Sequence, residues 1–202
     1  MTSNSVQAYI TRLCWNTNNW ISPSGSASQI ENGTFATQFG FGFEERLFSP
    51  YFIIGDWQYG FIQGINKSQK RLAGQTIDLY LYTIDKNKNR YLIGEIKNGV
   101  VLTLDESVMA HKELEKKGTI LKMIDDVEAV GGQGDFIKSK KYLQKWTLDI
   151  INFRYKISDF IGYQKDNILP KSSIIWKYSR YQLVNVNEHR LSDWLSHVYK
   201  DS

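Results

Sequence analysis

Two short runs of strand-forming residues, joined by a polar turn, constrain the fold of this chain more than any other feature. The first run covers residues 76–83 and the second covers residues 90–97, and both are rich in Tyr, Leu and Ile. These residue types favour β-strands, and the segment from Asp85 to Asn89 between them has the composition of a turn. The pattern predicts a β-hairpin.

The rest of the chain predicts further strands and a few helices. The helical pattern over 106–130 is divided at Gly118, and an amphipathic helix is expected at the C-terminal end, over 188–199. The remaining expectations are a short helix at 44–48 and strands at 8–15, 51–54, 58–66, 146–155 and 180–186. Strands and helices do not alternate regularly, so the predicted class is α+β, with a mostly antiparallel β-barrel of about six strands and peripheral helices.

Composition sets the size and the charge of the molecule. The 202 residues, 42% of them hydrophobic, are enough for a single domain over 1–202, with a helical insertion at about 106–140. A net charge of +4 and a pI near 9.0 are compatible with a polyanionic partner. Aromatic residues make up 14% of the chain, which is typical either of a β-rich core or of a surface on which a flat ligand stacks.

The residue types present also limit where the protein is expected to be located and which disulfide, metal or cofactor sites it is expected to contain. A single cysteine, Cys14, leaves no intramolecular disulfide and no cysteine-based zinc cluster. The N-terminal residues lack the pattern of a signal peptide, and no run is long and apolar enough to cross a membrane, so the expected location is the cytoplasm. His111 and His189 lie on predicted helices among charged residues, where we expect them to be solvated, and we expect no bound metal or cofactor.

The hairpin supports a nuclease interpretation. Restriction-type nucleases hold a divalent metal with carboxylates on neighbouring strands and carry a lysine two residues beyond one of them. Alternation along a strand places Glu95 and Lys97 on one face, and Asp78 or Asp85 is available to supply the second carboxylate. The opposing interpretation is that these residues form the solvated edge of an ordinary hairpin and that the chain is no enzyme.

Four segments, taken in their order along the chain, resemble the EVE domains of the PUA-like superfamily, which also includes YTH, ASCH and SRA modules. The first is the strand end at Cys14-Trp15-Asn16. The second, Gly74-Gln-Thr-Ile-Asp-Leu-Tyr-Leu-Tyr82, is similar to a Gly-Asp-x-Val-x-x-Tyr strand, with Gln75 in place of the aspartate. The third is Ile93-Gly-Glu-Ile96, and the last group comprises 149–154, 180–184 and 191–194.

The resemblance implies nucleic-acid binding, because several PUA-like modules hold a flipped, modified base in an aromatic cage. Such a cage must replace the stacking that the base loses on leaving the duplex. Turn residues are the natural candidates, since binding residues concentrate in loops. The expected base pocket comprises Trp15, Asn16, Trp20, Ser22, Ser24, Asp56, Trp57 and Tyr59, and the expected phosphate contacts are Arg12, Lys67, Lys70 and Arg71.

The sequence therefore favours a binding module that flips a modified base, 5-methylcytosine or a related cytosine in double-stranded DNA, into an aromatic pocket. Its expected place is the recognition module of a modification-dependent restriction or defence system, with a nuclease as a partner domain or chain. The second hypothesis is the metal-dependent nuclease, using Asp78 or Asp85 with Glu95 and Lys97. A third is a protein-interaction module that uses the aromatic surface from Phe35 to Phe61.

Overall fold

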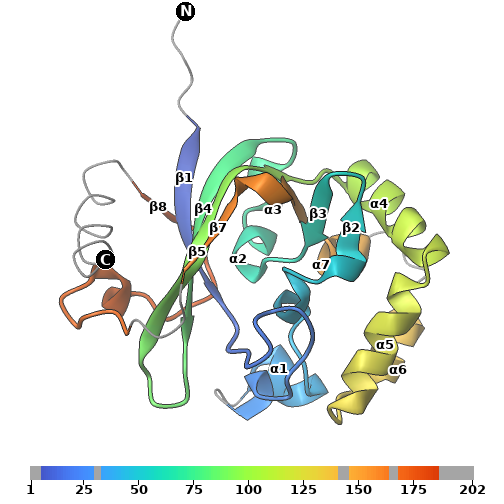
Figure 1. The fold of residues 1–202 in the computed structure, drawn as a ribbon, viewed down its shortest axis with the longest axis horizontal. Helices are drawn as coiled ribbons and strands as arrows, with labels where there is room; N and C mark the ends of the chain where they lie inside the picture. The colour runs from blue at the N-terminus through green and yellow to red at the C-terminus, as the bar shows by residue number, and fades with distance from the viewer. Residues whose placement is uncertain (1–5, 30–32, 141–145, 164–167, 187–202) are drawn as a thin grey trace, which may run out of the picture.

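A computed structural model describes residues 6–29, 33–140, 146–163 and 168–186. Eight strands form one sheet, and helices cover it (Figure 1). The strands are β1 (Gln7–Leu13), β2 (Ile53–Ile54), β3 (Trp57–Gly60), β4 (Thr76–Ile84), β5 (Arg90–Val101), β6 (Phe153–Lys156), β7 (Phe160–Gly162) and β8 (Val184–Asn185). The α-helices are α1 (Phe35–Phe39), α2 (Gln63–Asn66), α3 (Gln69–Leu72), α4 (Leu104–Lys116), α5 (Thr119–Ala129), α6 (Gly134–Lys140) and α7 (Thr147–Ile150). The 3-10 turns are η1 (Ala27–Gln29), η2 (Phe43–Arg46), η3 (Pro50–Phe52), η5 (Ile157–Asp159) and η6 (Ile174–Lys177).

The sheet is mixed rather than purely antiparallel. Its order is β2-β3-β6-β5-β4-β1-β8, and β7 also pairs with β5. Strand β1 runs parallel to β4, with Gln7 opposite Ile77 and Leu13 opposite Thr83, whereas the other pairings are antiparallel. The α+β class that the sequence predicts is confirmed.

The expected closed barrel of about six strands is not what forms. The sheet has eight strands, and β2 and β8 stand at its two ends without pairing to each other. Both end strands are two residues long, so they offer few backbone groups for a closing ladder. The sheet of the described residues is therefore open.

The predicted hairpin forms the centre of the sheet. Strands β4 and β5 pair from Thr76–Val100 to Ile84–Arg90, and the turn between them is closed by the carboxylate of Asp85, which accepts the backbone N–H of Asn89 at 2.8 Å. A bulge interrupts the register opposite Asp78, where Asn98 adopts a φ of 51°. Asp85 is thus a turn residue, as its sequence context indicates.

The two faces of the sheet are covered differently. On one face, Leu13, Leu79 and Leu81 pack with Ile62 and other residues of the main core. A second core lies between η2, β3 and helices α4 to α7, with α4, α5 and α6 to the right of the sheet in Figure 1. On the opposite face, Tyr80, Tyr82 and Ile84 pack against Leu169 and Ile175 of the C-terminal segment.

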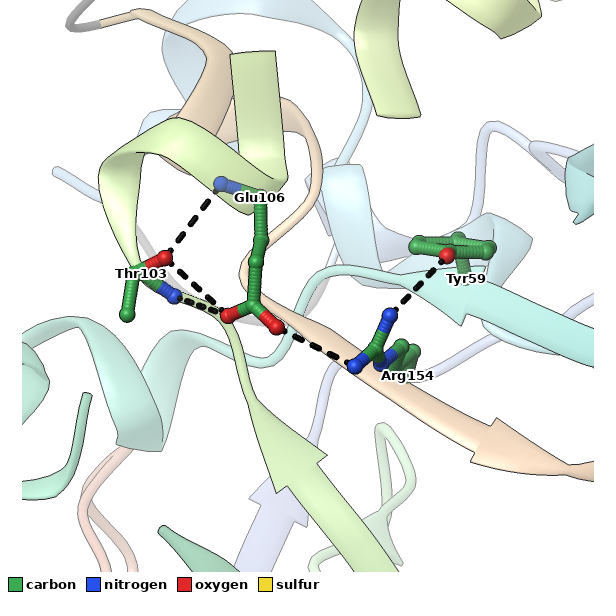
Figure 2. Close-up of polar contacts among 4 residues, drawn as sticks. All are labelled: Tyr59, Thr103, Glu106 and Arg154. Carbon is green, nitrogen blue, oxygen red and sulfur yellow. Dashed lines mark hydrogen bonds and ion pairs between the residues drawn. The ribbon is translucent and has the colours of Figure 1, made fainter. Parts of the chain in front are cut away.

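The first long helix, α4, begins at Leu104, two residues before the helical pattern that the sequence predicts. Thr103 caps the helix and Glu106 reaches back to it, with the backbone N–H of Thr103 donating to Glu106 Oε2 at 2.9 Å. The other oxygen of Glu106 accepts from Arg154 Nη2 of β6 at 3.1 Å, and Arg154 also donates to the hydroxyl of Tyr59 at 3.4 Å (Figure 2). One carboxylate therefore caps α4 and fixes it to the sheet. The helix ends before Gly118, whose φ of 75° confirms the predicted division from α5.

Several predicted strands are shorter than expected. The run 51–54 begins in the 3-10 turn η3 and pairs only at Ile53 and Ile54 of β2. The run 146–155 begins with helix α7 and becomes extended only at β6. The run 58–66 leaves the sheet after Gly60, because the side chain of Asn152 takes both backbone groups of Ile62, at 2.9 and 3.0 Å. The run 180–186 pairs with β1 only at Val184 and Asn185. In each case tertiary contacts override the β-propensity of the local sequence.

Two further expectations concern histidine and the membrane. His111, expected to be solvated, is buried on α4 with 4% of its surface exposed, and burial lowers its pKa. Within the described ranges, no helix combines the length and the apolar composition that crossing a membrane requires. The predicted helix at 188–199, which carries His189, lies outside the described residues.

Candidate functional site

A pocket of about 750 Å³ opens between the end of β1, helix α1, the start of η2, helices α2, α6 and α7, and the C-terminal segment at 179–181. Two close approaches bring these elements together. A Cβ on Gly42 would lie 3.0 Å from Cys14 Sγ, and one on Gly64 would lie 2.2 Å from Thr11 Oγ1. Glycine at these positions lets η2 and α2 pack directly against β1.

Aromatic rings form much of the pocket wall. Five of these rings form a connected set of neighbours. Between ring centroids, Phe35 lies 5.4 Å from both Phe43 and Phe136, and Phe136 lies 5.1 Å from Trp146. The ring of Phe43 lies 5.8 Å from that of Phe61 and 6.0 Å from that of Trp146. Tyr181 also lines the pocket, with the guanidinium of Arg12 4.6 Å from its ring centroid. Such a wall suits a flat, apolar-faced ligand.

A buried carboxyl group, that of Glu44, also lines the pocket. Only 3% of the residue is exposed, and each oxygen accepts one backbone N–H: that of Cys14 at 2.8 Å and that of Gln63 at 2.8 Å. Burial raises the pKa of Glu44 to about 7, while the two N–H donors and the positive charge of Arg12 oppose the rise. Glu44 therefore changes its ionisation state close to neutral pH.

Cys14 lies beside Glu44 and also lines the pocket. Burial raises the pKa of its thiol well above the usual value, and the carboxylates of Glu44 and Glu45 raise it further. A thiol in this setting stays protonated and is a poor nucleophile. The site therefore carries a titratable acid without an activated cysteine.

Polar and basic side chains complete the pocket. Asn66 donates to Asp149 Oδ1 at 3.4 Å, which joins α2 to α7. Lys67 and Arg180 also line the pocket, and both residues are exposed to solvent. The pocket thus combines an aromatic wall, a buried acid and basic groups that reach water.

The aromatic residues expected from the sequence to form the cage lie elsewhere. Trp20 is in the core, 2% exposed, with its indole N–H donating to the carbonyl of Cys14 at 2.9 Å. Trp15 is half-buried with its ring 5.7 Å from that of Tyr91. Trp57 and Tyr59 sit on β3 beside Arg154, whose guanidinium carbon is 4.8 Å from the Trp57 ring centroid. The structure does not bring these four rings together around one cavity.

The polar residues expected to read the base edge have structural partners. The amide of Asn16 donates to Glu45 at 2.8 Å and accepts the N–H of Trp20 at 2.9 Å. Ser24 donates to the same carboxylate, and Ser22 accepts from Asn18 at 3.4 Å. These groups form a network around Glu45, away from the pocket lining. Asp56 is exposed in the turn between β2 and β3.

The residues expected to contact phosphate are divided between core and surface. Arg12 is 1% exposed and donates to the carbonyl of Ser179, so its burial argues against a direct phosphate contact. Lys70 and Arg71 are exposed on α3, where Arg71 donates to the hydroxyl of Tyr9 at 3.2 Å. Lys67 alone of the twelve expected site residues lines the pocket.

The nuclease residues do converge, with one exception. Lys97 Nζ lies 3.3 Å from both Asp78 Oδ2 and Glu95 Oε2 and donates to the hydroxyl of Tyr80 at 2.9 Å. Burial opposes the charge of Lys97, but the Tyr80 hydroxyl and the two carboxylates raise its pKa overall. Asp85 belongs to the turn. In the part of the chain that the structure describes, no three metal-ligating side chains are arranged to hold an ion.

Several pocket residues are not identified by the sequence. The sequence predicts a strand over 146–155, which includes Trp146 and Asp149, and it gives no role to Phe136. Glu44 stands out there only as part of the acidic first turn of a short helix. The available signal is its position: Glu44 and Glu45 follow a run of phenylalanines, where a charged pair is costly unless it is bonded.

The surface from Phe35 to Phe61 is mostly interior. Phe41, Phe43 and Phe61 are 0%, 9% and 4% exposed. Tyr51 is exposed, and Phe35, Phe39, Phe48 and Trp57 are half-buried, so only part of the aromatic surface expected for protein interaction faces solvent. In comparisons with family models, with curated proteins and with solved structures, the chain matches none.

Proposed function

We propose that this protein binds nucleic acid and holds one unstacked base, a modified cytosine of double-stranded DNA, in the pocket lined by Phe43, Trp146 and Glu44. The observation that carries the proposal is the joining of an aromatic wall and a buried hydrogen-bonding group in one cavity of about 750 Å³. Ligand sites are commonly about 300–1,000 Å³, mostly apolar, with a few polar groups that fix orientation.

The aromatic wall can replace the stacking contacts that a flipped base loses when it leaves the duplex. Leaving the stack costs a few kcal/mol, and contact with aromatic side chains returns about 1–3 kcal/mol per base. Phe35, Phe43, Phe136 and Trp146 form a continuous set of rings for this purpose. A small apolar metabolite would use the same wall, but it would have no use for exposed basic groups at the opening.

Those basic groups favour a polyanion. Lys67 and Arg180 line the pocket and are exposed, and Lys70 and Arg71 follow on α3. Contacts from such side chains to phosphate position a nucleic acid without reading its sequence. Together with the net charge of +4, they support a DNA or RNA backbone running past the opening.

We also propose a distant relation to PUA-like barrels. Two of the segments that carry the resemblance lie on β4 and β5, and a third directly follows β1, the strand that pairs with β4. On this basis the protein is a reader rather than an enzyme, serving a modification-dependent restriction or defence system in the cytoplasm alongside a nuclease domain or chain. The relation predicts the chemistry of the partner, and the pocket supplies the means of binding it.

The nuclease remains a second candidate because Asp78, Glu95 and Lys97 are adjacent. The arrangement is the one that the sequence motif requires, but Lys97 lies between the carboxylates at 3.3 Å from each. That position satisfies both negative charges without a metal. A metal would have to displace the lysine before it could bind.

The test is a titration of matched duplexes containing cytosine, 5-methylcytosine or 5-hydroxymethylcytosine, with and without magnesium. We expect selective binding without cleavage, and a loss of about tenfold or more in affinity for Trp146→Ala, from the stacking energy of one base. Trp57→Ala, outside the pocket, is the matched control and should bind like the parent. Equal binding by the parent and by Trp146→Ala would refute the pocket, and magnesium-dependent cutting lost in Glu95→Ala would establish the nuclease.

A further inference from the structure

The orientation of the Glu44 carboxyl is fixed before any ligand arrives. Its two oxygens accept the N–H groups of Cys14 and Gln63, which belong to different parts of the chain, at 2.8 Å each. Residues Cys14, Glu44 and Gln63 all line the pocket. A carboxyl group held from two sides in this way has a defined edge to offer to a bound base.

Among the residues that the structure describes, few charged or titratable groups surround Glu44. Arg12 of β1 acts on it through space, and the thiol of Cys14 hydrogen-bonds to it. Its neighbour Glu45 is engaged by Asn16, Ser24 and Gly42. The other charged residues of the pocket lining are Lys67, Asp149 and Arg180. Burial outweighs these influences and brings the pKa of Glu44 to about 7.

The two ionisation states of a carboxyl group suit different bases. A neutral acid presents an O–H donor beside an acceptor, whereas a carboxylate presents acceptors only. The pairing edge of cytosine has an acceptor, N3, beside an amino donor, and therefore complements the neutral acid. The pairing edge of guanine has two adjacent N–H donors and complements the carboxylate. The neutral and the charged form of Glu44 would therefore complement different bases.

We propose that Glu44 reads the pairing edge of a flipped cytosine as a neutral acid, donating its proton toward N3 and accepting from the amino group. The inference rests on the proposed function and specifies its substrate class: a base with an acceptor–donor edge, here cytosine or a 5-substituted cytosine. Above the pKa of Glu44, binding therefore takes up one proton from water, and this proton lies between the carboxyl oxygen and N3 in the complex.

Proton uptake gives the proposal a directional test. Below the pKa of Glu44 the acid is already neutral and the affinity is constant. Above it, the affinity for a cytosine-containing duplex falls by up to about tenfold per pH unit, because the proton must be taken from water. The thiol of Cys14 has a pKa raised well above this range, and His111 on α4 is absent from the pocket lining.

The experiment measures the dissociation constant of a duplex carrying 5-methylcytosine at constant ionic strength from about pH 6 to about pH 8.5, for the parent and for Glu44→Gln. An amide offers a donor and an acceptor without titrating, so the variant should bind cytosine with little pH dependence. Glu44→Gln places an N–H₂ against a backbone N–H, and its folding is checked by thermal melting. A calorimetric titration of the parent in two buffers with different ionisation enthalpies reports proton uptake without any variant.

The outcomes separate the two proposals. Affinity that falls above pH 7, with about one proton taken up, supports the reading by Glu44. Selective binding with no proton uptake leaves the base pocket standing and refutes the role of Glu44. Affinity that rises with pH, accompanied by preference for a duplex with an unpaired guanine, overturns the assignment to cytosine. An absence of duplex binding at every pH refutes the proposed function itself.

Discussion

Glu44 accepts the backbone N–H of Cys14 at 2.8 Å, although thirty residues separate them along the chain. This bond ties η2 to the end of β1 and brings a carboxyl group to the pocket that the two elements share. Because a buried acid is destabilised when it is charged, the same bond contributes to folding, to pH dependence and to the chemistry of the site.

The free energy of unfolding should depend on pH through the ionisation of Glu44. Its folded pKa, about 7, lies above the ordinary value of 4.5, so the folded protein holds the proton more tightly than the unfolded chain does. Its stabilising contribution is full below about pH 4.5 and is lost as the pH rises to about 7, a difference of roughly 3 kcal/mol. Urea unfolding at several pH values should show this fall for the parent and a flatter profile for Glu44→Gln. Parallel profiles would contradict the assignment.

Two tryptophans should behave in opposite ways. Trp20 is 2% exposed and its indole donates to Cys14, so Trp20→Ala should lower the free energy of unfolding by about 3–5 kcal/mol. Trp146 is half-buried in the pocket wall, so Trp146→Ala should cost far less stability and mainly reduce ligand affinity. Denaturant titration and duplex binding measured on both variants check the distinction. Selective loss of binding in a fully stable Trp20→Ala protein would return Trp20 to the site.

Asn152 should be a large single contributor to stability. It is fully buried, and its side-chain amide pairs with both the N–H and the carbonyl of Ile62. Asn152→Ala leaves the buried N–H of Ile62 without its partner, whereas the carbonyl of Ile62 keeps the N–H of Ile65 at 3.0 Å. The loss should lower the free energy of unfolding by roughly 2 kcal/mol. The matched control is Asn87→Ala, at an exposed position in the β4–β5 turn, which should change it by less than about 0.5 kcal/mol. Similar effects for the two variants would count against the role given to the Asn152 amide.

Gly99 marks the closest packing across the sheet. A Cβ at this position would lie 2.0 Å from Cζ of Phe153, whose ring is fully buried. Gly99→Ala should therefore destabilise the protein by about 3 kcal/mol or more. Adding Phe153→Leu removes the obstructing ring, so thermal melting of the double variant should show part of the loss restored. Losses that simply add would place the cause in the backbone of β5 instead.

The sequence by itself determined the elements whose signals are local. The β4–β5 hairpin follows from two strand-forming runs and a turn that Asp85 closes, and the split between α4 and α5 follows from Gly118. The capping box likewise depends only on Thr103 and Glu106, which are three residues apart in the sequence. Backbone propensity and nearby side chains are sufficient for such features.

Only the tertiary structure decided where the site lies. Parallel pairing of β1 with β4 joins residues far apart in sequence, and the side chain of Asn152 turns Ile62 out of the sheet. Burial then gives residues of the same type different roles: Trp20 lies in the core, whereas Trp146 lines the pocket. Burial also removes the carboxyl group of Glu44 from solvent. Desolvation and ring packing depend on distances between remote segments, and no local pattern of residues contains those distances.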